Sequence, residues 1–447
     1  MQNKIPGLKW SYPPEYLNLS RKILDGALKL PGAYRSWQAL DPGRNYPVNA
    51  RFATLPVFTK KDIRENFPLG VVPADKDINQ GLANGEIQLV ESSGTTDDKV
   101  TNIWNQTWWN ASEKASWRLN SVMNKIATGS HREAILVNPK NVGVKSDDAD
   151  LLMESRRLDR FLYLNEKTDP LKWSQPLMDR MIKELNIFQP AVLEANPSYL
   201  ARLCRYISAS GRTVFQPGAI VFTYEYPSIV HQRQIRRVFN DVPTVSSYGT
   251  TETGYVFMQC EAGKFHQNSE FCRVDFQPFE PEHGGPLLGR ILVTPFSNPW
   301  SYYVRFDTGD LVCLEESGKC DCGRNSGMIL SAIAGRKINL TLTCSGRLVT
   351  LLELDGVMSR LENMESYKLV QKGPVNYELH LAAKLPDIKK LNAAAVSLLK
   401  ELYGAAAEIT IIHEADIAPE ISGKYLISQT AFPIDLEKYL DKEIVFA

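Results

Sequence analysis

Hydrophobic residues along this chain follow two different spacings. Apolar side chains recur every three or four positions, as on amphipathic helices, in residues 16–30, 173–188, 199–207 and 228–239. Short continuous apolar runs, typical of buried strands, occupy residues 87–90, 133–138 and 219–222. Helices that alternate with strands in this way predict parallel or mixed sheets flanked by helices, an α/β fold.

The pattern changes after Gly254. Proline and glycine become frequent and the apolar runs short, which predicts a small β-rich subdomain over residues 255–335. From about residue 336 the order is strand, strand, helix and strand, at residues 367–370, 377–381, 388–402 and 409–412. We therefore predict a large N-terminal domain, residues 1–335, and a small α+β C-terminal domain, residues 336–447, which carries Lys424.

Composition excludes several classes of protein. The 447 residues are 43% hydrophobic and 23% charged, and the 51 basic and 51 acidic side chains cancel. No apolar run approaches the roughly 18 residues of a transmembrane helix, and zero net charge provides no field for nucleic acid or a membrane surface. Since the N-terminal residues also lack a signal-peptide pattern, we expect a cytoplasmic protein.

Two polar segments follow predicted strands. After the strand at 87–90 come four hydroxyls around a glycine: Ser92, Ser93, Gly94, Thr95 and Thr96. Such a loop is suited to wrapping phosphate oxygens, although a solvated turn has the same composition. The segment at 247–254 combines an aromatic ring, hydroxyls and a carboxylate, so that Tyr248 can stack on a base and Glu252 can hold Mg²⁺.

These two segments belong to a longer series. Residues 92–96, 248–252, 308–310, 335–336 and 422–424, in this order and at these separations, resemble the signature segments of the adenylate-forming acyl-CoA ligases. The resemblance spans residues 90–430. Within that superfamily the chain is most similar to the phenylacetate-CoA ligases, because of its length and its Cys-Asp-Cys-Gly-Arg run at 320–324.

The resemblance implies a role for each segment. Ser92, Ser93, Gly94, Thr95 and Thr96 would bind the β- and γ-phosphates of ATP, and Tyr248 the adenine, with Gly249 and Thr250 beside it. Thr251 would contact the α-phosphate, Glu252 the Mg²⁺ and Asp310 the ribose. Arg336 would lie at the hinge on which a mobile C-terminal domain rotates, and Lys424 would bridge the substrate carboxylate and the α-phosphate as the electrostatic catalyst.

Three segments of the sequence depart from the family pattern. Lys337, Ile338 and Asn339 stand where the hinge usually carries a pair of aspartates, and Asp97, Asp98 and Lys99 replace the usual Gly-Lys-Pro. In the turn expected near adenine and substrate, Glu225 matches while Tyr226 replaces a proline. The hinge and the strength of ATP binding are the properties that these changes affect.

The cysteines and tryptophans indicate two further sites. Cys260, His266, Cys320 and Cys322 form a ligand set suited to structural Zn²⁺, and relatives carry metal at matching positions. The other thiols are expected to be core or incidental. Trp104 and Tyr224 would line an aromatic pocket for an aryl acid, although tryptophans at such spacing are also typical of a core.

We therefore expect an enzyme that joins a carboxylic acid to CoA through an acyl-AMP. Two alternatives stay open: transfer to a carrier-protein thiol or an amine, and a nucleotide-binding scaffold that has lost catalysis. The expected partners are the acid, ATP, Mg²⁺ and CoA, without nucleic acid or membrane. Neither a carrier protein nor a homodimer is decided at this stage.

Overall fold

A computed structural model describes residues 10–91, 99–144, 150–383, 388–420, 422–442 and 444–445. The chain divides into two compact units. Unit 1 comprises Met1–Ser121, Ser247–Ile333 and Glu437–Ala447, and unit 2 comprises Val122–Ser246 and Ala334–Leu436. The chain thus passes between the units four times. Among the described residues, no helix is long and apolar enough to cross a membrane.

Unit 2 begins with a mainly parallel sheet. Strand β6 (Val192–Ala195) lies between β3 (Glu133–Leu136) and β7 (Ala219–Phe222), and all three are fully buried. Beyond β3 come β5 (Phe161–Tyr163), parallel, and the short antiparallel edge β4 (Arg157–Leu158). The first residues of β8 (Thr244–Thr250) pair in parallel with β7. The parallel sheet predicted from the alternation of elements is confirmed.

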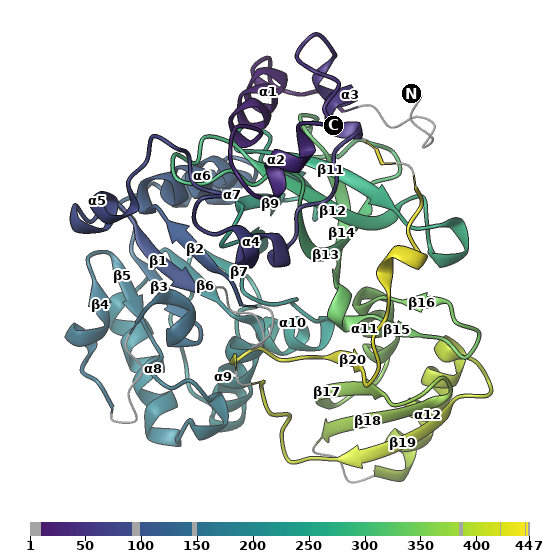
Figure 1. The fold of residues 1–447 in the computed structure, drawn as a ribbon. Coiled ribbons are helices and arrows are strands. Elements are labelled where there is room, and N and C mark those ends of the chain that lie inside the picture. Colours follow the sequence, from purple (N-terminus) through teal and green to yellow (C-terminus); the bar gives the residue numbers. More distant parts are fainter. Residues whose placement is uncertain are drawn as a thin grey trace. The chain divides into compact units, whose positions relative to one another are not determined.

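Helices cover one face of this sheet (Figure 1). Alternate strand residues such as Leu136, Leu193 and Phe222 pack against α8 (Gln175–Phe188) and α9 (Pro197–Ser210) in one apolar core. Asn196 caps α9 through bonds from the amides of Ser198 and Tyr199. The opposite sheet face carries Glu133 and Glu194. The remaining helices of this part are α7 (Ser121–Ile126) and α10 (Ile229–Arg236).

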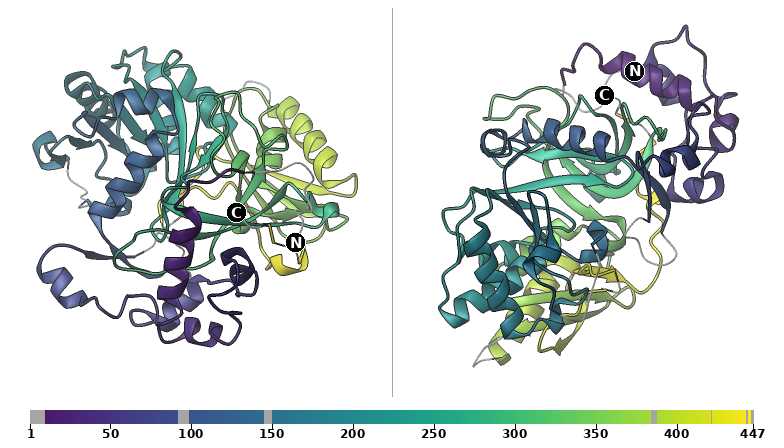
Figure 2. Two further views of the ribbon diagram at one scale, coloured as in Figure 1. Left: turned by 90° about the horizontal axis from the view of Figure 1, so that it is seen from above. Right: turned by 90° about the vertical axis from the view of Figure 1, so that its left-hand side faces the viewer.

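The C-terminal part of unit 2 has its own sheet, in the order β19-β18-β17-β20. Figure 2 shows α12 lying along this sheet, where Leu391 and Leu399 join the core around Leu379. The elements are β15 (Thr341–Leu342), β16 (Leu348–Val349), α11 (Leu351–Met358), β17 (Met364–Gln371), β18 (Asn376–Ala383), α12 (Ile388–Tyr403), β19 (Glu408–His413) and β20 (Ser428–Thr430). The strand-strand-helix-strand order predicted here is confirmed, whereas α11 and β20 were not predicted.

Unit 1 is built on antiparallel strands. Its sheet runs β11-β12-β13-β14-β10-β9-β8, and β8 contributes only its last four residues. The strands are β9 (Gly254–Gln259), β10 (Phe265–Gln267), β11 (Cys272–Pro278), β12 (Leu288–Pro295), β13 (Phe306–Leu314) and β14 (Ile329–Arg336), whose last three residues belong to unit 2. These strands confirm the β-rich subdomain.

Short helices and one hairpin complete unit 1. An apolar core joins the N-terminal helices to residues 296–306. The elements are α1 (Tyr16–Ala27), α2 (Ala33–Trp37), α3 (Val48–Ala53), α4 (Lys60–Asn66), α5 (Ile78–Ala83), β1 (Gln88–Glu91), β2 (Thr101–Trp104) and α6 (Gln106–Trp117). The strand predicted at 87–90 forms, but the prediction that it is buried was wrong. Of these residues only Ile87 is buried, and the largely exposed β1 forms a two-stranded hairpin with β2, whose Asn102 and Ile103 are buried.

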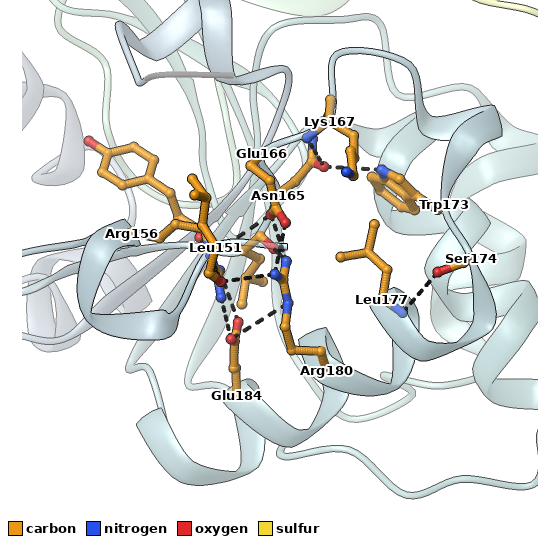
Figure 3. Close-up of polar contacts among 12 residues, drawn as sticks. Leu151, Arg156, Asn165, Glu166, Lys167, Trp173, Ser174, Leu177, Arg180 and Glu184 are labelled. Carbon is orange, nitrogen blue, oxygen red and sulfur yellow. Dashed lines mark hydrogen bonds and ion pairs between the residues drawn. The ribbon is translucent and has the colours of Figure 1, made fainter. Parts of the chain in front are cut away.

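An ion network fastens α8 to the segment after β5 (Figure 3). The fully buried Arg156 pairs with Glu184 and lies 3.8 Å from Glu166, and Arg180 donates to Glu166 at 2.6 Å. Next to them, Asn165 accepts the indole N–H of Trp173. Each buried carboxylate therefore has a guanidinium partner, which offsets the loss of its hydration.

Candidate functional site

In unit 1, two of the predicted nucleotide-binding segments meet. Tyr248 lies on β8, and Thr308 and Asp310 lie on β13. The Tyr248 hydroxyl donates to Asp310 Oδ2 at 2.9 Å, and its oxygen also lies 3.0 Å from Thr308 Oγ1. The sequence placed Tyr248 in a loop after the strand, but β8 continues through it to Thr250. Residues sixty positions apart are thus brought into direct contact.

The turn after β8 carries the predicted Mg²⁺ ligand. Glu252 is buried, and its Oε1 lies 3.5 Å from Asn102 Nδ2, while Asn102 accepts the Tyr303 hydroxyl at 2.9 Å. Among the described residues, the hydrogen bond found for this buried carboxylate is one long amide contact; carboxylate oxygens are ligands that Mg²⁺ prefers, so the residue fits the role of Mg²⁺ ligand.

The same turn explains two smaller expectations. A Cβ at Gly249 would lie 2.4 Å from the carbonyl oxygen of Gly254, so only glycine fits there. The hydroxyls of Thr250 and Thr253 lie 3.0 Å apart, and the half-buried Thr251 lies between them in the chain. The turn is therefore held by its own hydroxyl groups next to Glu252.

The predicted phosphate loop lies outside the described residues. Ser92, Ser93, Gly94, Thr95 and Thr96, with Asp97 and Asp98, connect β1 to β2. At the foot of this hairpin, Lys99 pairs with Glu91 at 3.3 Å. The neighbouring positive charge is therefore already shared with a carboxylate on β1.

Trp104 ends β2 and starts a row of aromatic rings. Its ring centroid lies 4.2 Å from that of Trp109, which lies 4.9 Å from Tyr255. Tyr255 in turn donates to Glu113 at 2.8 Å. Trp109 and Tyr255 were not predicted as site residues, although Trp109 follows Trp104 closely in the sequence.

In unit 2, Tyr224 follows β7 in a backbone conformation that non-glycine residues rarely adopt, with φ of 70°. Its hydroxyl donates to Glu194 Oε1 at 2.6 Å. Burial and the neighbouring Glu133 raise the pKa of Glu194 to about 8. Glu133 in turn contacts His131 at 3.1 Å and Arg160 at 3.0 Å.

This polar group was missed because its carboxylates sit inside apolar strand sequences. Glu133 begins β3 and Glu194 lies within β6. The β3–β6 register pairs Glu133 with Val192 and Ile135 with Glu194, which places both glutamates on the sheet face opposite α8 and α9. Only the pairing register, which is not readable from one strand alone, brings them together.

Glu225 has two well-defined partners. Ser198 donates to Oε2 at 2.8 Å, and the backbone amide of Tyr425 donates to Oε1 at 2.7 Å. Burial raises the pKa of the Glu225 carboxyl, while these two hydrogen bonds, the nearby Asn196 side chain and the charge of Lys424 lower it. The predicted adenine contact of Glu225 stays a prediction.

The loop that carries Lys424 packs closely on neighbouring residues of unit 2. Tyr199 donates to the Gly423 carbonyl at 3.2 Å, and Asn138 Nδ2 lies 3.5 Å from the Ser422 carbonyl. Gly423 has φ of 79°, and a Cβ there would lie 1.9 Å from Asn138 Nδ2. Glycine at 423 is thus required both by the backbone and by the close approach of Asn138.

The predicted hinge residue Arg336 ends β14. Asn339, in place of an expected aspartate, is buried and bonded to β20: it donates to the Ser428 carbonyl at 3.0 Å and accepts the Ser428 hydroxyl on its own carbonyl oxygen. A Cβ at Gly335 would lie 2.7 Å from that of Leu351. The side-chain N–H of Asn339, a donor that an ionised aspartate lacks, thus joins this segment to β20 without a charge.

The four predicted zinc ligands converge in unit 1. The ligand atoms of Cys260, His266, Cys320 and Cys322 all lie within 4.8 Å of one another. Cys260 and Cys320 sulfurs are 3.6 Å apart, and the Cys322 sulfur is 3.3 Å from His266 Nε2. Ligands at the corners of a zinc tetrahedron are separated by about 3.3–3.8 Å, so these residues fit the ion.

No family model and no curated protein matches the sequence. Among solved structures, the chain is similar to 2-hydroxyisobutyryl-CoA ligase in the postadenylation state in complex with R3-HIB-AMP. The identity is 14%, the match covers 98% of this chain and 95% of that one, and the TM-score is 0.64.

A structure of the same ligase in complex with 2-HIB-AMP and CoA, in the thioesterification state, also matches. Its identity is 15%, the coverage 94% and 91%, and the TM-score 0.55. At sequence identities this low, structural similarity is evidence for the fold and not for the substrate. The coverage and the TM-scores show that the chain has the fold of 2-hydroxyisobutyryl-CoA ligase.

Proposed function

We propose that the protein activates a carboxylic acid with ATP, forming an acyl-AMP and pyrophosphate, and then transfers the acyl group to the thiol of CoA. The observation that carries this proposal is the bond between Tyr248 and Asp310, because it joins two of the signature segments in a chain with the matching fold. The ligase with that fold is described with acyl-AMP and CoA, which supports the same reaction class here.

In the first step a carboxylate oxygen attacks the α-phosphorus of ATP, and the bond to the pyrophosphate oxygen breaks. Negative charge accumulates at the α-phosphate during the attack. The Lys424 ammonium would stabilise that charge, and Thr251 would hydrogen-bond the phosphate. Mg²⁺ bound at Glu252 would neutralise phosphate charge, while Asp310 and Tyr248 would hold the ribose and the base, with Gly249 and Thr250 beside them.

In the second step the CoA thiol gives its proton to solvent and its sulfur attacks the acyl carbon. A C–S bond forms, the bond from the acyl carbon to the phosphate oxygen breaks, and AMP leaves. Arg336 would mark the point at which the C-terminal part of the chain turns between the steps. Residues 1–335 and 336–447 stay our proposed functional division. It differs from the compact units, since residues 334–436 pack with 122–246 and residues 437–447 with unit 1.

For the substrate we propose an aryl or arylalkyl acid. The row of rings formed by Trp104, Trp109 and Tyr255 supplies flat apolar surface in unit 1. In unit 2, Tyr224 would contribute a phenol that is held by Glu194. Structural Zn²⁺ on the Cys260 cluster would be separate from this chemistry.

The decisive experiment is a screen for acid-dependent pyrophosphate release with Mg-ATP and a panel of aryl and aliphatic acids. We expect release with at least one acid, and a loss of several orders of magnitude in Lys424→Ala with an unchanged melting temperature. Lys400→Ala, at an exposed position on α12, is the matched control. ATP binding without pyrophosphate release for any acid would instead support a scaffold that has lost catalysis.

The same assay identifies the acceptor. With an active acid, CoA should give a thioester and consume the adenylate. A hydroxamate formed with hydroxylamine, in the absence of any CoA thioester, would point to a carrier-protein thiol or an amine as the acceptor.

A further inference from the structure

Three consecutive side chains after β7 each bind a different element of unit 2. Tyr224 donates to Glu194 on β6, and Glu225 accepts the backbone amide of Tyr425. Tyr226 hydrogen-bonds Asp355 on α11, which also accepts the amide of Ile229 at 2.7 Å. A single turn thus connects the parallel sheet to the segment that carries Lys424 and to the neighbouring C-terminal sheet.

We propose that Glu225 is a positioning residue for Lys424: its carboxylate fixes the backbone at Lys424 and Tyr425 and so holds the ammonium in place for the adenylation step. The proposal rests on the proposed function for what the ammonium then does. It does not require Glu225 to touch nucleotide or acid.

The carboxylate is itself held rigidly. Its two oxygens have different partners, Ser198 at the start of α9 and the Tyr425 amide, so rotation of the side chain would break both bonds. Ser198 lies in the first turn of α9, whose backbone is fixed by the Asn196 cap. A half-buried carboxylate that accepts two short hydrogen bonds is therefore a fixed point against which the loop can be placed.

The loop depends on such external bonds. Within it, Lys424 accepts the Glu420 amide on its carbonyl at 2.8 Å, and its own amide lies 3.4 Å from Ser422 Oγ. The contacts to Tyr199 and Asn138 are 3.2 Å and 3.5 Å. The bond from the Tyr425 amide to Glu225, at 2.7 Å and to a carboxylate, is shorter than the contacts to Tyr199 and Asn138, and it lies one residue from the ammonium-bearing position.

The flanking tyrosines keep Glu225 pointed at the loop. Tyr224 holds a positive φ, an unfavourable conformation for a non-glycine residue that persists only where the surroundings enforce it. Its bond to Glu194, and that of Tyr226 to Asp355, fix the two neighbours of Glu225. Tyrosine at 226, which departs from the family proline, supplies a hydroxyl that proline lacks.

Hydrogen exchange tests the positioning without any substrate. The Tyr425 amide should exchange at least ten-fold faster in Glu225→Ala than in the wild-type protein, and Glu225→Gln, whose amide oxygen still accepts a bond, should retain most of the protection. Glu401→Ala, at an exposed glutamate on α12, should leave the exchange unchanged. Equal exchange of the Tyr425 amide in wild type and Glu225→Ala would overturn the proposal.

Steady-state kinetics with an active acid provide the second readout. Positioning of Lys424 predicts that Glu225→Ala lowers kcat for pyrophosphate release at least ten-fold, with less than a three-fold change in the KM for ATP. A direct nucleotide contact predicts the reverse, a raised KM with kcat retained, and would overturn the assignment. If Glu225→Ala does not fold, Ser198→Ala removes one of the two supports and should give a smaller effect of the same kind.

The two proposals can fail separately. Absence of pyrophosphate release by the wild-type protein with every acid rejects the proposed function. The exchange of the Tyr425 amide still decides whether Glu225 holds the loop, because that measurement needs no turnover.

Discussion

Asp355 on α11 shows how a single buried carboxylate makes stability depend on pH. It accepts the Ile229 amide at 2.7 Å and the Tyr367 hydroxyl at 3.0 Å, with Tyr226 as a third donor and Arg233 as a nearby positive charge. Burial nevertheless dominates and raises the pKa of Asp355 from 3.8 to about 6. The folded protein therefore holds this proton more tightly than the unfolded chain.

We predict that the wild-type protein loses stability relative to Asp355→Asn as the pH rises from about 4 to 6. The unfolded carboxyl ionises freely in that interval while the folded one does not, and the interval corresponds to roughly 3 kcal/mol. Urea unfolding of both proteins at pH 4, 5, 6 and 7 measures the difference. Asp241→Asn, at an exposed position, should show no such slope, and a constant difference for Asp355→Asn would contradict the prediction.

At the residue scale, sequence reasoning named candidate groups for chemistry and missed some of the residues that contact them. Tyr248, Glu252, Asp310 and Lys424 were predicted from local motifs. Glu194 was not, because a glutamate inside an apolar run gives no indication of which sheet face it occupies or what lies opposite.

At the scale of elements, a buried ion network holds α8 in place. The guanidinium of Arg156 lies between the carboxylates of Glu166 and Glu184, and all three side chains are buried. Removing one partner of a buried pair leaves an uncompensated charge, which is far more costly than the pair is favourable.

We predict that Arg156→Met lowers the free energy of unfolding by about 3–5 kcal/mol. Arg157→Met, at the exposed neighbouring position, should change it by less than about 1 kcal/mol, as is usual for surface substitutions. Urea unfolding followed by circular dichroism measures both. Similar values for the two variants would show that the network contributes little.

The four predicted zinc ligands come from three parts of unit 1. Cys260 directly follows β9, His266 lies on β10, and Cys320 and Cys322 lie between β13 and β14. We predict about one zinc per chain by elemental analysis, and loss of zinc with a lower melting temperature in Cys320→Ser. Cys344→Ser, outside the cluster, should keep the metal. A stable wild-type protein without metal would reject the site.

Element prediction succeeded where the periodicity is strong and local. The strand at 219–222 and the helix from 388 agree with β7 and α12 to within one residue. It failed for β20, since Ser428–Thr430 is polar and becomes a strand only by pairing with β17. It also misjudged β1, whose apolar residues were taken as a sign of burial.

For the whole molecule, the last residues of the chain matter most. Residues 437–445 return to unit 1, where Val445 and Phe276 exchange backbone bonds of 2.8 and 3.0 Å and Arg290 pairs with Glu437 at 2.6 Å. Leu440 is buried, and its backbone forms a bridge with Phe279, which directly follows β11. The segment that follows the Lys424 loop is thus held at its C-terminal end by unit 1, as the loop before it is held by contacts within unit 2.

We predict that Leu440→Asp destabilises unit 1 by at least about 2 kcal/mol, because a carboxylate would replace a buried apolar side chain next to the edge strand β11. Lys442→Asp, at an exposed position two residues on, should be nearly neutral. Hydrogen exchange of β11 amides and thermal unfolding measure the effect. Unchanged protection of β11 in Leu440→Asp would show that this segment does not support the strand.

The sequence by itself determined the helices and strands with strong local periodicity, and which side chains are candidates for nucleotide, metal and catalytic roles. It did so because periodicity, turns and short motifs depend on neighbours in the chain. Only the tertiary structure decided that Tyr248 meets Asp310, that Glu225 holds the amide next to Lys424 and that residues 437–445 return to β11. Such contacts join residues sixty to two hundred positions apart, and they depend on strand order, register and backbone direction, which no local pattern encodes.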